Sequence, residues 1–100
     1  MADRRDRCNV KGVIHKLFFA DGGVQALAFE DSQGRKTVGV VTPGKWYFGM
    51  ADKPETIVIT SGELKINKKT YRPIMSCQIK AGDSIIFETE GFVTYLCYKD

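Results

Sequence analysis

The sequence predicts an all-β protein, and three observations lead to that fold class. Apolar residues recur at every second position in short runs that are rich in β-branched and aromatic side chains, which is typical of strands with one buried face. Gly, Asp, Asn and Pro gather between these runs, as they do in turns. The 3.6-residue period of an amphipathic helix is absent from the pattern. We therefore expect a small, jelly-roll-like β-barrel of two antiparallel sheets, with no helix longer than about two turns.

The same pattern predicts the order of the elements along the chain. Expected strands, in order, are Val10–Leu17, Gln25–Phe29, Thr37–Thr42, Lys45–Met50, Thr56–Ser61, Glu63–Ile66, Ser76–Lys80, Ser84–Phe87 and Phe92–Tyr98. Turn-forming residues connect them, at Asp21-Gly22-Gly23, Asp31-Ser32-Gln33-Gly34, Pro43-Gly44, Ser61-Gly62, Asn67-Lys68-Lys69 and Ala81-Gly82-Asp83. No linker or internal repeat divides this series, so we expect one domain over residues 1–100, with a flexible basic segment at residues 1–8.

Apolar residues persist on both sides of Ser61-Gly62, within the stretch Thr56–Ile66. A glycine at this point supplies the positive φ that a tight turn requires, so the stretch predicts a hairpin with one buried face. The alternation after the turn places two side chains inward, Leu64 and Ile66, and two outward, Glu63 and Lys65.

Composition narrows the possible functions. The net charge of +3 is small, and the Lys68-Lys69 pair falls in an expected turn, so we do not expect nucleic-acid binding. No apolar run is long enough for a membrane helix, and the charged N-terminus lacks an apolar signal segment. Three widely spaced cysteines, Cys8, Cys77 and Cys97, indicate a reducing compartment. Each falls in an apolar stretch, so we expect core or half-buried positions, with a reactive thiol as the alternative. These features predict a cytoplasmic protein.

Three residues have a spacing known from a family of small barrels. Glu55 and Gly62 are followed about twenty residues later by Gly82 in an Ala-Gly-Asp turn, and this spacing resembles the cupin superfamily. Lys45 and Tyr47 stand where metal-binding cupins carry two histidines. Since the chain has a single histidine, His15, and no cysteine pair, we expect neither a metal nor another cofactor.

A narrower resemblance extends from Gly34 to Phe87. Its matching segments, Gly34–Val40, Pro43–Phe48 and Pro54–Leu64, are similar to the pyrimidine/purine nucleoside phosphorylase family of cupins. The resemblance implies phosphorolysis of purine and pyrimidine nucleosides to free base and ribose 1-phosphate. The alternative is a non-catalytic, small-molecule-binding cupin, which is favoured by a short Gly91–Tyr95 stretch that lacks the histidine-bearing segment of the family.

Candidate site residues follow from the chemistry of that reaction. The guanidinium of Arg35 is suited to phosphate, because it can form two parallel charge-assisted hydrogen bonds. Glu55 could bind ribose hydroxyls or stabilise positive charge at the anomeric carbon. In the Lys45–Phe48 strand, the register of the cupins would place Lys45 and Tyr47 at the mouth of the barrel, with Tyr47 catalytic and Lys45 binding substrate. A register shifted by one would instead make Trp46 and Phe48 a stacking platform for the base.

A homodimer is also expected. An open barrel of 100 residues leaves edge strands exposed, and in the cupin register Trp46 would project outward. Two-fold pairing is the commonest way to cover such surfaces.

Overall fold

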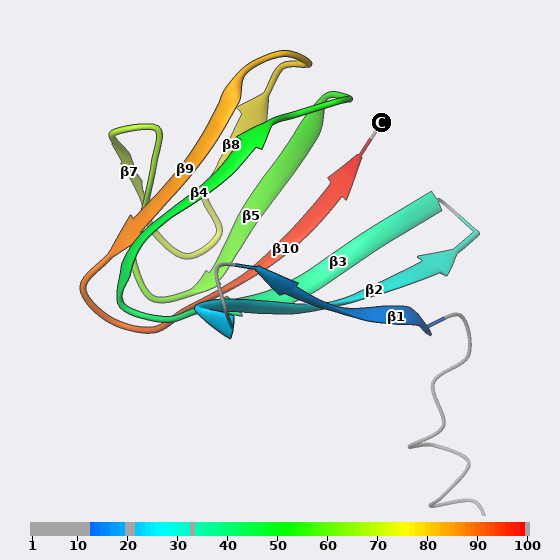
Figure 1. Cartoon of the computed structure of the whole chain (residues 1–100), viewed down its shortest axis with the longest axis horizontal. Coiled ribbons are helices and arrows are strands. Elements are labelled where there is room, and N and C mark those ends of the chain that lie inside the picture. The colour runs from blue at the N-terminus through cyan, green and yellow to red at the C-terminus, as the bar shows by residue number, and fades with distance from the viewer. Residues whose placement is uncertain (1–12, 20–21, 33, 100) are drawn as a thin grey trace, which may run out of the picture.

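The computed structural model describes residues 13–19, 22–32 and 34–99 of the chain. Within them lie ten strands and no helix, so the all-β class is confirmed (Figure 1). The strands are β1 (Val13–Phe19), β2 (Val24–Asp31), β3 (Gly34–Val41), β4 (Gly44–Met50), β5 (Glu55–Ser61), β6 (Leu64–Ile66), β7 (Lys69–Tyr71), β8 (Ser76–Ile79), β9 (Ser84–Thr89) and β10 (Val93–Lys99). No helix in the described part of the chain is long and apolar enough to cross a membrane.

The strands form two antiparallel sheets that face each other. One sheet has six strands in the order β1-β2-β3-β10-β5-β8, and the other has four in the order β4-β9-β6-β7. The sheets form an open sandwich (Figure 1), so the expected two-sheet architecture is confirmed whereas the closure of a barrel is not. Both sheets therefore keep edge strands.

The expected strands match the observed ones except at β7. The sequence pattern assigned Asn67-Lys68-Lys69 to a turn, but Lys69 already pairs with Ile66 in a β6–β7 hairpin. Its two turn residues, Asn67 and Lys68, both have positive φ, at 49° and 74°, as a type I′ turn requires. The Asn67 side chain also binds the backbone of β9 at Ser84 and Ile86, which extends the sheet into the turn. The expected segment at residues 1–8, Cys8 and the beginning of the first strand lie outside the described residues.

The hairpin expected around Ser61-Gly62 is wrong. β5 pairs with β10 and β8 in one sheet, while β6 pairs with β7 and β9 in the other, so the turn crosses between sheets. Gly62 has φ +83°, and a Cβ there would collide with the carbonyl oxygen of Phe92. The expected alternation after the turn is confirmed, because Leu64 and Ile66 are buried and Lys65 is exposed.

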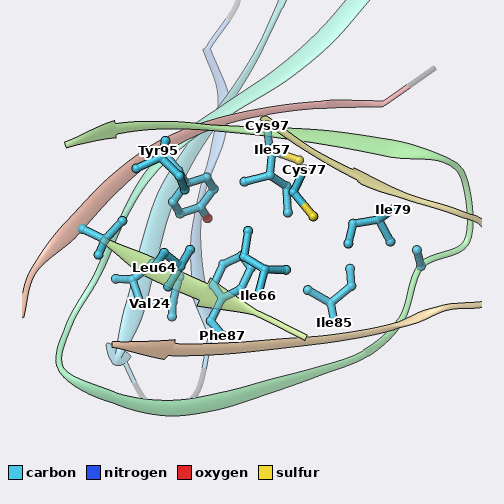
Figure 2. Close-up of a cluster of buried hydrophobic side chains, with 14 residues drawn as sticks. Val24, Ile57, Leu64, Ile66, Cys77, Ile79, Ile85, Phe87, Tyr95 and Cys97 are labelled. Atoms are coloured by element: carbon cyan, nitrogen blue, oxygen red, sulfur yellow. The ribbon is translucent and has the colours of Figure 1, made fainter. Parts of the chain in front are cut away.

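The core lies between the sheets. Figure 2 shows side chains of the six-stranded sheet, among them Ile57, Cys97 and Tyr95, facing Ile85 and Phe87 of the smaller sheet. Ile57, Ile59, Leu64, Ile66 and Val93 are each at most 2% exposed. Because burial of such a side chain stabilises a fold by roughly 1.5–3 kcal/mol, this apolar layer holds the two sheets together.

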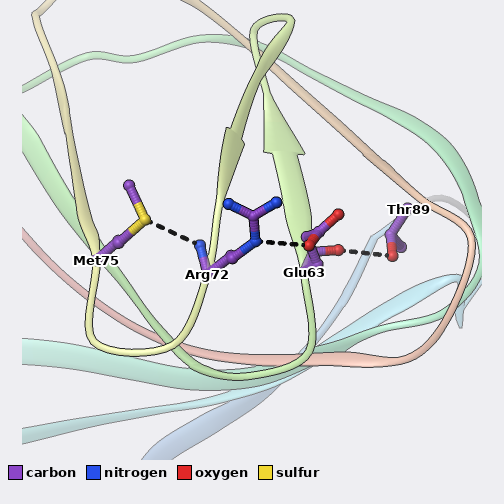
Figure 3. A network of polar contacts seen from close by, with 4 residues as sticks. All are labelled: Glu63, Arg72, Met75 and Thr89. Atoms are coloured by element: carbon purple, nitrogen blue, oxygen red, sulfur yellow. Dashed lines mark hydrogen bonds and ion pairs between the residues drawn. The ribbon is translucent and has the colours of Figure 1, made fainter.

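A chain of polar contacts connects Glu63, which precedes β6, with the segment after β7 and the end of β9 (Figure 3). Arg72 Nε donates to Glu63 Oε2 at 2.9 Å, and Thr89 Oγ1 donates to the Glu63 carbonyl oxygen at 3.1 Å. The Arg72 and Glu63 side chains are 67% and 57% exposed, so their ion pair adds little to stability. The hydrogen bond from Thr89, which is partly buried, ties the end of β9 to the residue that precedes β6.

Candidate functional site

The candidate site lies where the inner face of the large sheet changes from apolar to polar. Alternate residues of β10 share this face, beginning with the buried Val93 and Tyr95 and ending at Lys99. β5 shows the same change over a shorter distance, from Ile57 to Glu55. The last residues of β10 pair with the first residues of β3 and β5, because the strands are antiparallel. The polar residues of the three strands therefore gather at one end of the sandwich.

A pocket of about 630 Å³ opens at this end. One wall comes from β3, β5 and β10 of the large sheet, and the other from β4 and β9 of the small sheet. The apolar part of the lining includes Leu17, Phe48, Ile57, Ile85, Phe87 and Tyr95. Its volume and mixed lining are those of a small-molecule site.

Charged side chains of both signs line the pocket, namely Arg35, Asp52, Lys53, Glu55 and Lys99. Lys99 on β10 is directly opposite Glu55 on β5. On the other side of β10 the ladder with β3 pairs Tyr98 with Lys36, so Lys99 lies one position further along, at the level of Arg35. The structure therefore brings Arg35 and Glu55, two of the residues expected from the sequence, to one pocket, with Lys99 on the strand between theirs.

Glu55 is held by a neighbour inside the pocket. The Cys97 thiol donates a hydrogen bond to Glu55 Oε1 at 3.2 Å. Burial, together with the hydrogen bond and the negative charge of Glu55, raises the pKa of Cys97 to about 12. At neutral pH Cys97 is thus a protonated thiol and a hydrogen-bond donor, not a thiolate nucleophile.

Three aromatic rings from different strands contact one another along the pocket. The ring centroids of Phe48 and Phe87 are 4.8 Å apart and those of Phe87 and Tyr95 are 5.8 Å apart, both with edge-on geometry. Tyr95 lies over Gly39, where a Cβ would come within 2.8 Å of its ring. Burial raises the pKa of the Tyr95 phenol above its ordinary value, so the hydroxyl stays protonated. These rings give the pocket an apolar surface with polar groups beside it.

The orientation of β4 is opposite to the one that the cupin register predicts. Lys45 and Tyr47 lie on the outer face, where Tyr47 is 65% exposed and the Lys45 ammonium lies 5.6 Å from its ring centroid. Neither residue lines the pocket. The expected placement of Lys45 and Tyr47 at the mouth is therefore wrong, because the apolar Trp46 and Phe48 take the inward positions against the core.

Those two inward residues do not form one platform. Phe48 lines the pocket, whereas Trp46 packs toward Gly23 and Gly44 and donates from Nε1 to the Thr42 carbonyl at 2.9 Å. The inward position of Trp46 also removes the outward aromatic on which the expected homodimer partly depended. The pairing of β4 with β9 shifts between Tyr47 and Met50, where Gly49 has φ +82°, and Met50 also lines the pocket.

The donor groups of the pocket do not fit a metal site. The positions of the two cupin histidines are occupied by Lys45 and Tyr47, which face outward. Nor do three His, Cys, Asp or Glu side chains gather in a suitable arrangement anywhere in the described part of the chain. We derive no chemical step through a metal. The side chain of His15 lies outside the described residues.

Three charged residues of the pocket, Asp52, Lys53 and Lys99, were not predicted from the sequence, and Cys97 was predicted as a core or half-buried residue with a reactive thiol as the alternative. The period-two pattern puts Tyr95, Cys97 and Lys99 on one face of a strand, so the face they share could have been identified. That this face of β10 lies beside Glu55 and Arg35 depends on the pairing of β10 with β5 and β3, which are distant in the sequence. Asp52 lies in the β4–β5 connection, which has no periodic pattern to interpret.

The two-sheet sandwich with a pocket between its sheets has the fold of cupin-type proteins. Among solved structures, the Cupin_2 domain of an XRE-family transcriptional regulator from Enterobacter cloacae superimposes with a TM-score of 0.53, at 15% identity, over 63% of this chain and 76% of that domain. A protein of unknown function from Vibrio parahaemolyticus superimposes with a TM-score of 0.77, at 27% identity, over 84% of this chain and 95% of the other.

Sequence comparison identifies the family. The family model described as pyrimidine/purine nucleoside phosphorylase matches residues 15–98. A pyrimidine/purine nucleoside phosphorylase of Anaeromyxobacter sp. is 38% identical in an alignment that covers 97% of this chain and 97% of that protein. The chain belongs to the pyrimidine/purine nucleoside phosphorylase family. The match ends at Tyr98, one residue before the end of β10, and it extends on both sides of the Gly34–Phe87 region in which the resemblance is strongest.

Proposed function

We propose that this protein cleaves purine and pyrimidine nucleosides with inorganic phosphate. The supporting observation is that one pocket contains a guanidinium, a carboxylate and an aromatic wall, from Arg35, Glu55 and Phe48. These are the three kinds of group that an oxyanion, a ribose and a base need. The membership of the chain in the family supports the same reaction.

The reaction balances without a cofactor. An oxygen of hydrogen phosphate forms a bond to C1′ of the ribose, and the bond between C1′ and the base nitrogen breaks with its electron pair going to the base. The proton of hydrogen phosphate ends on that nitrogen, so the products are ribose 1-phosphate and the neutral base. The protein supplies orientation and charge complementarity rather than a covalent nucleophile.

Each pocket residue has a separate role in the proposal. Arg35 holds the attacking phosphate, and Glu55 faces the ribose, where positive charge develops as the glycosidic bond weakens. Phe48 and Phe87 border the base. Tyr47 and Lys45 have no role, because they lie on the outer face of β4. A homodimer and a cytoplasmic location stay parts of the proposal.

The test is release of free base from uridine, cytidine, adenosine, inosine, guanosine and xanthosine, with and without phosphate. We expect phosphate-dependent release by the wild type. Arg35→Ala should raise the KM for phosphate and lower kcat/KM roughly a hundredfold, with partial rescue in Arg35→Lys, which keeps the charge without the planar fork. Glu55→Gln should lower kcat with little change in the KM for phosphate.

Matched controls are Arg72→Ala and Glu90→Gln, which change the same residue types away from the pocket and should leave the kinetics unchanged. Equal activity of wild type and Arg35→Ala would remove Arg35 from the site. A wild type that releases no base from any nucleoside, yet binds one of them calorimetrically, would show instead a non-catalytic binding cupin.

A further inference from the structure

Lys99 is the least expected charged residue of the pocket. Its neighbours on β10 that face the same way, Tyr95 and Cys97, are buried, and Lys99 continues this inner face to the edge of the sheet. It lies between the strands of Arg35 and Glu55, one position beyond the Tyr98–Lys36 pair on one side and opposite Glu55 on the other. The strand pairing thus places a second cation beside the residue proposed to hold phosphate.

The Lys99 ammonium forms an ion pair with Asp52, and a bound anion could replace the Asp52 carboxylate. Its Nζ lies 3.2 Å from Asp52 Oδ1, and the two side chains are 45% and 74% exposed. The hydrogen bond from Lys99 and its charge lower the pKa of Asp52, so the carboxylate is ionised at neutral pH. Because exposed ion pairs are weak, a phosphate dianion that also contacts Arg35 can compete for the ammonium group.

We propose that Lys99 is a second oxyanion ligand beside Arg35, and that the Asp52 carboxylate occupies its ammonium group until the oxyanion binds. The identification of that oxyanion with the attacking phosphate rests on the proposed function. Binding itself requires only the tetrahedral, doubly charged group that inorganic phosphate and a phosphate monoester share. Asp52 then acts as an internal competitor, which sets how much phosphate is needed to fill the site.

The alternative cation is Lys53, which lines the same pocket from the β4–β5 connection. A structural difference favours Lys99. Lys99 is the last residue of β10 and pairs with Glu55 of β5, so its backbone position relative to Glu55 is fixed, whereas Lys53 is in a loop. Pre-organised ligands lose less freedom on binding.

Calorimetry with inorganic phosphate, at constant ionic strength set with chloride, tests the inference without reference to catalysis. Lys99→Ala should weaken phosphate binding about tenfold or more, and Lys99→Arg should retain it within about threefold. Asp52→Asn should strengthen it about two- to fivefold, as expected for release from an exposed ion pair. This gain should vanish when Asp52→Asn is combined with Lys99→Ala, since Asp52 acts through Lys99.

Lys80→Ala and Asp83→Asn are the matched controls, since both residues are exposed and lie away from the pocket, and neither should change the Kd. A second titration with ribose 1-phosphate distinguishes the two sources of the oxyanion. If only the ester binds through Lys99, the ligand is the product and not the attacking phosphate. Circular dichroism of each variant verifies the fold.

Three results would overturn the inference. These are no binding of either inorganic phosphate or ribose 1-phosphate by the wild type, an unchanged Kd for both ligands in Lys99→Ala, and a loss of affinity in Lys53→Ala that Lys99→Ala does not share. Failure of the proposed function is a separate outcome. A wild type that binds phosphate through Lys99 but releases no base leaves the oxyanion site in place and removes only the reaction.

Discussion

At the residue scale, the contact between Cys97 and Glu55 explains how a carboxylate can be held inside a partly apolar pocket. The thiol donates to Oε1 at 3.2 Å from the directly neighbouring strand. A thiol is a weak donor, and it carries no charge that would compete for substrate. The carboxylate is therefore oriented by the protein while its negative charge stays available for the ribose.

The raised pKa of Cys97 predicts a pH-dependent stability. Near pH 9 the thiol of the unfolded chain begins to ionise, while in the folded protein it stays protonated up to about pH 12. Unfolding then releases a proton, so the stability that this thiol contributes is complete below pH 9 and is lost as the pH rises toward 12. The free energy of unfolding should fall by about 1 kcal/mol per pH unit between pH 9 and 10.

Urea denaturation of wild type and Cys97→Ser at pH 7, 8, 9 and 10 measures this effect. Serine keeps a donor for Glu55 and does not titrate, so the difference between the two proteins isolates Cys97 from the other groups. Parallel pH profiles of the two proteins would contradict the assignment.

At the scale of elements, the β5–β6 connection determines which sheet each half of the chain enters. The chain leaves the six-stranded sheet at Ser61 and enters the four-stranded sheet at Leu64, with Gly62 at φ +83° between them. The carbonyl of Phe92 lies against Gly62, so the crossing also depends on the β9–β10 connection. The local sequence predicts only a turn at this point. That the turn passes from one sheet to the other, against the carbonyl of Phe92, is a feature of the tertiary structure.

Three glycine substitutions separate the causes of strain at this crossing. Gly82→Ala, at φ +91° with open space around it, should cost about 1–2 kcal/mol from the backbone conformation alone. Gly62→Ala adds the collision with Phe92 and should cost roughly 2–5 kcal/mol. Gly91→Ala, in open space and without a positive φ, should be nearly neutral. Urea denaturation gives the three values, and equal costs for Gly62→Ala and Gly82→Ala would mean that the collision is relieved.

At the scale of the whole molecule, the expected homodimer stays a prediction, but its physical reason changes. Trp46 packs inward and cannot support it. The outer face of the six-stranded sheet instead carries a row of directly paired apolar residues, Leu27, Val38, Leu96 and Val58. Leu27 is 44% and Val38 39% exposed. A two-fold axis through this row would place it against the same row of a second copy, which is the isologous contact of a dimer.

Light scattering across micromolar concentrations should give the mass of a dimer for the wild type. Val38→Lys should give a monomer, because it places a charge in the middle of the row. Phe92→Lys changes another exposed apolar residue, in the β9–β10 connection, and should leave the dimer intact. A monomer mass for the wild type would refute the prediction.

What the sequence determines by itself is local. The alternation of apolar and polar residues predicts the strands and the inward side of β6, because a strand turns successive side chains to opposite faces. Glycines at turns predict where the chain reverses. Arg35 and Glu55 could be identified as candidate site residues from their chemistry and the family resemblance, and Phe48 from the alternative register of its strand. All three line the pocket.

Tertiary structure decides what depends on contacts between distant segments. Both faces of β4 carry an aromatic residue, so only packing against the core could select Trp46 and Phe48 for the inside over Tyr47. The position of Lys99 beside the strands of Arg35 and Glu55 comes from the pairing of β10 with β3 and β5, which the period of a single strand cannot specify. The charged residues of the pocket come together because antiparallel pairing brings the beginnings of β3 and β5 and the end of β10, which are far apart along the chain, to one end of the sandwich.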